Sequence, residues 1–269
     1  MWLRLRQIAL VAEDLDAAVE RLRAVFGLEV CFRDRAVAHF GLVNALLPVG
    51  DQLLEVVAPL PDAGGERSAA GRYLARRGGP GGYMVISQCD DHAPRRRRVE
   101  QLGIRVVGSL ETAAFRHLQL HPKDTGGSFL EIDEQLGPRA HASDGPWEPA
   151  GGAAWTGARR TERVAGIRAA EIQADDPVRV AARWAEITEL PVALRDGTPT
   201  LDLDNASLRF VPCRDGRPEG LGALDLETRD RAAVLAAAEA GAAEAVSGVS
   251  GGVTGAAQVT LCGVRFNLL

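Results

Sequence analysis

The chain has 269 residues, of which 46% are hydrophobic, 25% charged and 5% aromatic, in the range of globular proteins rather than disordered or fibrous ones. At roughly 100–200 residues per domain, this length predicts about two domains. The formal net charge of −5 argues against nucleic acid as an electrostatic partner. An apolar run of about 18 residues is absent, as is a secretory signal pattern near the first residues, so we expect a cytoplasmic protein without membrane contact.

The first quarter of the chain has a clear order of predicted elements. Residues 3–11 form a strand-like stretch that leads to Asp14, and apolar residues at helical spacing follow until Gly27. Two apolar runs, 43–49 and 52–58, are separated by Gly50 and Asp51, as in a β-hairpin. The quarter is therefore predicted to fold as strand, helix and further strands.

The same order recurs three times. The later copies begin with strands near residues 84–87, 167–176 and 221, and each strand is followed by a helical pattern. Their hairpins are predicted around residues 117–132, at Asp204–Asn205, and over 258–268. Residues 137–160 are rich in Gly, Pro and Ala, which predicts a linker between the second and third copies.

Four segments of the first half carry a resemblance to a known superfamily. They are residues 7–15 (QIALVAEDL), 39–48 (HFGLVNALLP), 72–82 (RYLARRGGPGG) and 121–127 (HPKDTGG). With them, the chain resembles the vicinal-oxygen-chelate superfamily, that is, glyoxalase, bleomycin-resistance and dioxygenase-like proteins. The resemblance implies an α+β fold of four βαβββ modules in two pairs, with curved mixed sheets that half-enclose a cleft. Domains are expected at 1–136 and 163–269, with 137–162 as the linker.

The repeats allow equivalent positions to be compared within this one chain. Counting back from the aspartate after each first strand gives Gln7, Met84, Ala169 and Ala223. Aligning the last strands of the hairpins gives Glu55, Glu131, Arg209 and Arg265. Alanine and arginine cannot ligate a divalent cation, so any chemistry is expected in the first half, and the second half is expected to be degenerate.

The resemblance implies that such positions hold a divalent metal, either Zn, Ni, Mn, Mg or Fe. Gln7, Glu55 and Glu131 are the candidate ligands. Met84 departs from the pattern, because a thioether is a poor ligand for these metals. Metal-free acid–base chemistry in the same cleft is the alternative.

Glu55 is a candidate on its own sequence context. It lies in an apolar strand, LLEVV, where an unpaired carboxylate is costly and needs a partner, a metal or a catalytic role. Gln7 lies among Leu5, Ala9 and Val11 in the same way. A hydrogen-bonded Gln7–Glu55 pair with a purely structural role is the other interpretation.

The remaining candidates are histidines and two cleft positions. Glu55, Glu131 and His121 are the candidate catalytic residues, and His39, Asn44 and Met84 are the candidate substrate contacts. His117 and His121 are too far apart along one strand to share a metal. His92 at the start of a helix and the run 95–98 (RRRR) are expected on the surface. Residues 248–252 (GVSGG) match a nucleophile elbow only formally, without the strand, helix and histidine order, and are expected to form a loop.

Two function classes remain from these observations. The first is a glyoxalase-like enzyme that carries out lyase or isomerase chemistry on a small oxygenated molecule in the N-terminal cleft. The second is a non-catalytic protein that binds a small molecule, such as a drug or metabolite, of the bleomycin-resistance type. A further expectation is that the second half serves only for dimerisation, which would give a homodimer, or as a structural cover.

Overall fold

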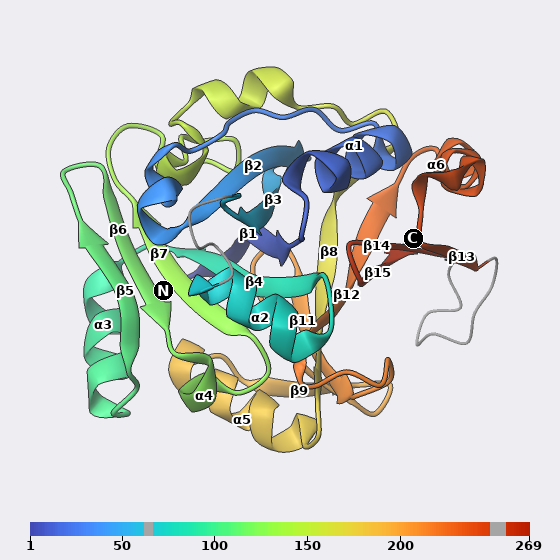
Figure 1. The fold of residues 1–269 in the computed structure, drawn as a ribbon. Coiled ribbons are helices and arrows are strands. Elements are labelled where there is room, and N and C mark those ends of the chain that lie inside the picture. Colours follow the sequence, from blue (N-terminus) through green and yellow to red (C-terminus); the bar gives the residue numbers. More distant parts are fainter. Residues whose placement is uncertain (62–66, 248–256) are drawn as a thin grey trace.

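The computed structural model describes residues 1–61, 67–247 and 257–269 (Figure 1). Within these ranges the chain is a mixed α+β protein whose strands join one large sheet. The predicted nucleophile-elbow match at residues 248–252 lies outside the described residues. Every helix in the described ranges is too short or too polar to span a bilayer.

The first half contains seven strands and four α-helices in its described residues. The strands are β1 (Leu3–Val11), β2 (Leu42–Val49), β3 (Gln52–Pro59), β4 (Gly81–Cys89), β5 (Val106–Glu111), β6 (Phe115–Leu120) and β7 (Phe129–Gln135). The helices are α1 (Leu15–Phe26), α2 (Ala69–Arg77), α3 (His92–Gln101) and α4 (Pro122–Thr125), with a 3₁₀ turn η1 (Ala36–Phe40).

The second half has eight strands and two α-helices in its described residues. Its described strands are β8 (Val164–Ala174), β9 (Val192–Arg195), β10 (Thr198–Asp202), β11 (Ser207–Pro212), β12 (Gly220–Thr228), β13 (Ala245–Ser247), β14 (Ala257–Leu261) and β15 (Val264–Leu268). The helices are α5 (Pro177–Thr188) and α6 (Arg231–Ala237), the latter continued by a π-helical turn η5 (Ala238–Ala242).

One pairing recurs four times along the sheet. A strand that precedes a helix pairs in parallel with the last strand of the following hairpin, as β1 with β3, β4 with β7, β8 with β11 and β12 with β15. The leading strands then pair antiparallel, β1 with β4 and β8 with β12, and a single pairing of Leu221 with Gly82 joins the two halves.

The aspartates used to align the repeats have one structural role. Asp14, Asp91, Asp176 and Asp230 are the N-caps of α1, α3, α5 and α6, and each side chain accepts a backbone N–H of the first helical turn. The predicted hairpins of the first and fourth copies are confirmed as β2–β3 and β14–β15. Local patterns therefore predicted these helix starts and these two hairpins correctly.

The main core lies between the sheet and the helices. Alternate residues of each strand point to it, for example Ile8 and Leu10 of β1 and Leu130 and Ile132 of β7. The other set of alternate residues faces the concave side of the sheet, where two smaller apolar clusters flank polar side chains. The polar side chains of β1, β3, β6 and β7 on this side form the candidate site.

Residues 137–162 are folded against the first half. This segment contains the 3₁₀ turns η3 (Glu148–Ala150) and η4 (Ala154–Ala158) and passes beside β2 (Figure 1). Trp147 and Trp155 are fully buried in it and pack with Leu53 and Ile86 of the concave face. The Arg6 guanidinium lies 5.3 Å from the Trp147 ring centroid and 5.1 Å from that of Trp155. The segment thus closes part of the concave side.

Candidate functional site

Two of the predicted residues, Gln7 and Asn44, contact a third, Glu55. Strand pairing places Glu55 on β3 between Ala9 of β1 and Leu46 of β2, with its side chain half-buried. Gln7 donates from Nε2 to Glu55 Oε2 at 2.8 Å, and Asn44 donates from Nδ2 to Glu55 Oε1 at 2.7 Å. Both carboxylate oxygens are thus bound by neutral amides.

The orientation of the two amides is determined by their other partners. The Trp147 indole nitrogen is only a donor, and its Nε1 lies 2.9 Å from Gln7 Oε1, so the oxygen of Gln7 must face Trp147. The backbone N–H of Asp34 likewise donates to Asn44 Oδ1 at 2.8 Å. Because each oxygen is engaged elsewhere, each NH₂ group points at Glu55.

Glu55 is shifted toward its protonated form. Burial raises its pKa to about 7, although the hydrogen bond from Asn44 acts in the opposite direction. The negative charge of Glu131 adds to the increase. A carboxyl group of this kind exchanges a proton readily near neutral pH, which is the property required of a general acid or base.

A second polar group lies on the β6–β7 hairpin. The Nδ1 atom of His117 lies 3.2 Å from Glu131 Oε1 and 3.2 Å from Asp133 Oδ1. Burial opposes the charged form of His117, but the two carboxylates outweigh it and raise its pKa to about 11. Burial and the charge of Glu131 raise the pKa of Asp133 well above its ordinary value. Among the described residues, these three side chains form a group able to hold a metal ion.

Met84 lies between the two polar groups in the strand order. It is opposite Ala9 on β1 and Phe129 on β7, and its sulfur accepts a hydrogen bond from Gln119 Nε2 at 3.3 Å. Gln119 in turn is the β6 neighbour of Glu131. At the predicted cleft position, the Met84 sulfur is therefore a weak acceptor that already binds the side-chain amide of Gln119.

Two predicted histidines lie apart from these groups. His39 is exposed on η1, where its ring meets Phe40 edge-on with centroids 5.6 Å apart. His121 caps α4, and its Nδ1 accepts the backbone N–H of Lys123 at 3.1 Å. These positions give each ring a local structural role.

The surface prediction for α3 was wrong at His92 and Arg95, whereas Arg97 is exposed as expected. His92 is 1% exposed, and Arg95 is 2% exposed because its guanidinium reaches the carbonyl oxygen of Thr188 at the end of α5. The polar composition of α3 concealed this contact, since the covering helix comes from the second half of the chain. Arg95 is an interface residue rather than part of a solvated face.

The concave face of the second half is closed by ion pairs. Arg209 Nη2 lies 2.8 Å from Asp225 Oδ1, and Arg265 Nη2 lies 2.8 Å from Glu171 Oε1. Glu171 is opposite both Arg209 and Ala223, as Ala9 is opposite Glu55 and Met84. This cleft is filled by salt bridges.

Strand register corrects one alignment of the repeats. Arg265 pairs with Ala223 as Phe129 pairs with Met84, so Arg265 is not the counterpart of Glu131. The residue two positions further along, Asn267, occupies that place and pairs with Asp225. The error arose because sequence spacing was counted without the register between the parallel strands.

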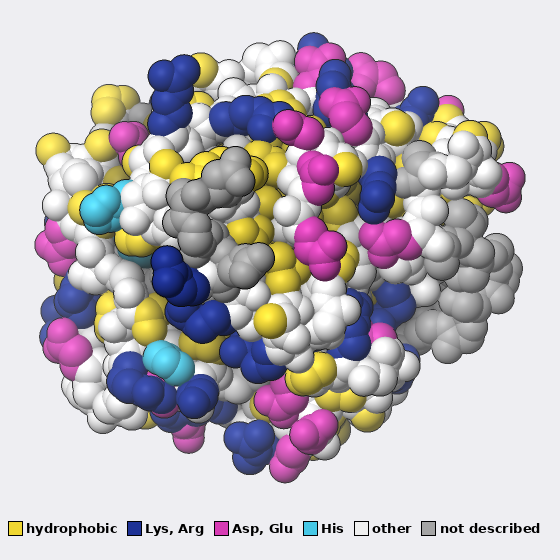
Figure 2. Space-filling model, in the orientation of Figure 1, with side chains coloured by type: hydrophobic (Ala, Val, Ile, Leu, Met, Phe, Trp, Pro, Cys, Tyr) yellow, Lys and Arg dark blue, Asp and Glu magenta, His cyan; other side chains and the backbone are white. Residues whose placement is uncertain are grey.

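Two hollows lie in this part of the molecule, and one of them shares Asn44 with the site. One of about 740 Å³ is lined by Asn44 and by residues that include Leu42, Arg33 and Arg35, and its size is that of a ligand pocket. On the face of the molecule drawn in Figure 2, hydrophobic side chains gather in the middle, and Lys and Arg side chains lie below them near α2.

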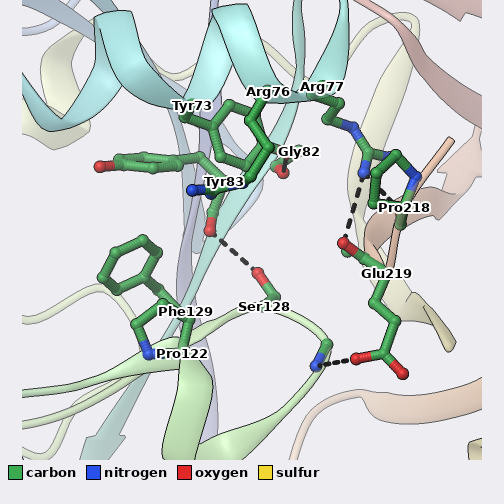
Figure 3. Close-up of a pocket in the computed structure, with 12 residues that line it drawn as sticks. Tyr73, Arg76, Arg77, Gly82, Tyr83, Pro122, Ser128, Phe129, Pro218 and Glu219 are labelled. Carbon is green, nitrogen blue, oxygen red and sulfur yellow. Dashed lines mark hydrogen bonds between the residues drawn. The ribbon is translucent and has the colours of Figure 1, made fainter.

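The second hollow, of about 50 Å³, lies between α2, β4 and residues 218–220, and can hold only a few water molecules (Figure 3). In it Arg77 donates to the Pro218 carbonyl oxygen at 2.8 Å and Ser128 to that of Tyr83 at 2.9 Å. It is a junction between the halves.

Comparison with known proteins identifies the class. Residues 8–188 match the family described as "Glyoxalase-like domain", so the chain belongs to this family of the vicinal-oxygen-chelate superfamily. A hypothetical protein from Staphylococcus aureus has the same fold over 100% of both chains, with a TM-score of 0.60 and 13% identity.

Two more specific relatives are epimerases. An ethylmalonyl-CoA/methylmalonyl-CoA epimerase of Cereibacter sphaeroides is 29% identical over 135 residues, which are 49% of this chain and 97% of that protein. A Streptomyces coelicolor methylmalonyl-CoA epimerase, solved with 2-nitronate-propionyl-CoA, shares 27% identity over 50% of this chain and 98% of that chain, with a TM-score of 0.43.

Several residues of the site were missed by sequence reasoning. Asp133 alternates with Glu131 on β7, so the period of two along a strand could have placed both on one face. His117 was considered only together with His121, although its partners lie on the neighbouring strand. Trp147 carried no signal, because it reaches Gln7 across 140 residues of chain.

Proposed function

We propose that the N-terminal cleft catalyses an isomerase-type proton transfer at a carbon atom next to a carbonyl group, with Glu55 as the acid–base residue. The observation that carries the proposal is the state of Glu55. Its carboxyl group has a pKa raised to about 7 and is held in one orientation by Gln7 and Asn44. An acid–base group acts best when its pKa lies near the working pH.

In the proposed step, the Glu55 carboxylate removes the proton from the carbon. The electron pair of the broken C–H bond moves into the carbonyl group and forms an enolate. Water then delivers a proton to the opposite face of the enolate carbon, which completes the isomerisation, and the proton held by Glu55 passes to the resulting hydroxide or to solvent. Gln7 and Asn44 keep the carboxylate oxygens in place, and their hydrogen bonds prevent the carboxyl group from rotating away.

The substrate class is an acyl thioester, by analogy with the Cereibacter epimerase. That relative is matched over 97% of its length at 29% identity, and its name states chemistry of the proposed kind. The hollow beside Asn44 has room for the acyl part of such a molecule, and Leu42 and Val43 give part of its wall an apolar surface.

The metal implied by the superfamily does not fit the strand positions where it was expected. The Gln7 oxygen is turned to Trp147 and Met84 is a thioether, so Glu55 is the one of these three side chains that directs an oxygen ligand into the cleft. The proton transfer is therefore assigned to Glu55 without a cation at Gln7 and Glu55.

The architecture supports one active half. We interpret the four recurring pairings as four βαβββ modules, with 1–136 and 163–269 as the two units and 137–162 packed between them. The ion pairs of Arg209 and Arg265 fill the second concave face, so the second unit acts as a support.

A binding protein is the second candidate. Trp147 and Trp155 are fully buried against the concave face, which leaves a smaller and more apolar space than an open cleft would have. A metabolite bound there without reaction would also contact Met84 and Phe129.

The test is proton exchange. The protein is incubated in D₂O with methylmalonyl-CoA or ethylmalonyl-CoA, and deuterium incorporation at the α-carbon is followed by mass spectrometry. Removal of the base by Glu55→Gln should lower the exchange rate by at least about 100-fold. Glu227→Gln, an exposed residue of the second half paired with Arg168, is the matched control and should leave the rate unchanged.

Unchanged exchange in Glu55→Gln would overturn the role of Glu55. Absence of exchange in the unaltered protein, together with a higher melting temperature in the presence of either thioester, would replace the enzyme by the binding protein.

A further inference from the structure

The β6–β7 hairpin carries a group of side chains that the proposed proton transfer does not use. His117 is on β6, and Glu131 and Asp133 are alternate residues of β7, so all three side chains lie on one face. One ligand atom from each lies within 4.8 Å of the others, a spacing that one metal ion can bridge.

The burial of this group is unusual for its charge. The side chain of Asp133 is 0% exposed and that of Glu131 is 8% exposed, yet the two carboxylates share one histidine ring. Two buried carboxylates and one ring are an unfavourable combination in a site of low dielectric constant, because two negative charges meet at most one positive charge. A divalent cation would neutralise both.

One oxygen of the group has no partner. Asp133 Oδ1 accepts the backbone N–H of Leu118 at 3.3 Å and faces His117, whereas Asp133 Oδ2 is buried without a hydrogen-bond partner among the described residues. A buried carboxylate oxygen without a donor costs free energy of folding, and coordination of a cation is one way to recover it.

The strand positions implied by the superfamily differ in each of these respects. Gln7 and Glu55 have their oxygens engaged by Trp147, Gln7 and Asn44, and Met84 is bound by the amide of Gln119. They offer no unpartnered oxygen and no nitrogen ligand of the imidazole type. Of the expected set, only Glu131 is directed into the hairpin group.

We propose that this chain holds a divalent transition-metal ion on the β6–β7 hairpin, ligated by His117, Glu131 and Asp133, instead of at Gln7, Glu55 and Met84. One imidazole nitrogen and two carboxylates suit Mn²⁺, Fe²⁺ or Zn²⁺ better than Mg²⁺ or Ca²⁺, which prefer oxygen ligands alone. Three protein ligands leave a coordination position for water or a substrate oxygen.

The experiment compares variants of the two ligand sets by metal titration. The full-length protein is stripped with a chelator and titrated calorimetrically with MnCl₂ and, separately, with ZnCl₂. Asp133→Asn and His117→Ala should each weaken binding by at least about 100-fold, since loss of a ligand costs at least as much as loss of its outer-shell partner. Glu55→Gln and Gln7→Ala should bind as the unaltered protein does.

Two further measurements keep the result decisive. Circular dichroism confirms that each variant is folded, and half-exposed His117 is the safer site if Asp133→Asn does not fold. In the Co²⁺-substituted protein, the visible absorption spectrum should change in His117→Ala and stay unchanged in Gln7→Ala.

Loss of binding in Glu55→Gln or Gln7→Ala with retention in His117→Ala would place the ion at the strand positions and overturn the proposal. Absence of binding of either metal to the unaltered protein would overturn it as well. The titration contains no thioester, so its outcome is independent of the proposed isomerase activity.

Discussion

The concave faces of the two halves carry opposite charges at one pair of matching positions, Glu55 in the first half and Arg209 in the second. In the second half, Glu171 and Asp225 are bound by Arg265 and Arg209, so each buried carboxylate faces a guanidinium. In the first half, Glu55 is bound by two neutral amides and stays close to Glu131. One framework thus supports either neutralised charges or a carboxyl group that titrates near neutral pH, and the side chains alone make the difference.

The largest expected effect comes from breaking the neutral pairing of the second half. Arg209→Met removes the guanidinium bound to Asp225, which is 2% exposed and would keep Asn267 as its hydrogen-bonding partner. Leaving a buried carboxylate uncompensated typically costs about 3–5 kcal/mol, so the free energy of unfolding in urea should fall by that amount.

The double variant Arg209→Met with Asp225→Leu provides the control for this prediction. It removes both charges and should recover most of the lost stability. A loss below about 1 kcal/mol in the single variant would show that the ion pairs do not close this face.

The next effect concerns the carboxyl group of the first half. The folded protein raises the pKa of Glu55 from 4.5 to about 7, so folding favours its protonated form. This contribution is fully present below pH 4.5 and is lost as the pH rises to about 7, since the unfolded chain ionises first. Between pH 4 and pH 8, the stability of Glu55→Gln relative to the unaltered protein should therefore rise by about 1–3 kcal/mol. At pH 4 the variant should be the less stable of the two, because its new NH₂ group faces the NH₂ group of Gln7 or Asn44.

Urea unfolding at a series of pH values measures this difference. Glu227→Gln, with its exposed ion pair to Arg168, should show no comparable dependence on pH. Parallel curves for the unaltered protein and Glu55→Gln would contradict the raised pKa.

The smallest effect separates the two buried tryptophans. Trp147→Phe keeps most of the ring but removes the donor to Gln7, and Trp155→Phe removes the donor to the Gly145 carbonyl oxygen, both at 2.9 Å. Each should cost about 1 kcal/mol of stability. Only Trp147→Phe should also lower the proton-exchange rate, by several-fold, because Gln7 then loses its fixed orientation toward Glu55.

An equal exchange rate in the two variants would show that Trp147 does not position Gln7. A loss of exchange in Trp155→Phe alone would show that Trp155 supports the exchange reaction and that Trp147 does not.

Part of the site was predictable from local sequence. A hydrogen-bonded Gln7–Glu55 pair was one of the two interpretations of these polar residues in apolar strands, and the structure places Gln7 Nε2 2.8 Å from Glu55 Oε2. Asn44 lies in the same hairpin as Glu55, so its proximity follows from strand pairing. Such contacts depend on strand period and hairpin register, both of which are local properties.

The other part depends on residues far apart in the chain. The segment 137–162 was predicted as a linker from its Gly, Pro and Ala content, and the structure folds it onto the concave face through Trp147 and Trp155. Arg95 was expected on the surface and is buried by α5. Composition describes a segment by itself, whereas burial depends on what another segment places against it.

The sequence by itself determined the β2–β3 and β14–β15 hairpins, the aspartates that cap four helices, and the half of the chain that keeps the carboxylates Glu55 and Glu131 at the compared positions. These features follow from residue periodicity and turn chemistry over short distances. Only the tertiary structure decided which partner each polar side chain has: Trp147 for Gln7, His117 for Glu131, and arginine for the carboxylates of the second half. The reason is physical, since the pKa and ligand capacity of a buried group are determined by the neighbours that the fold brings to it.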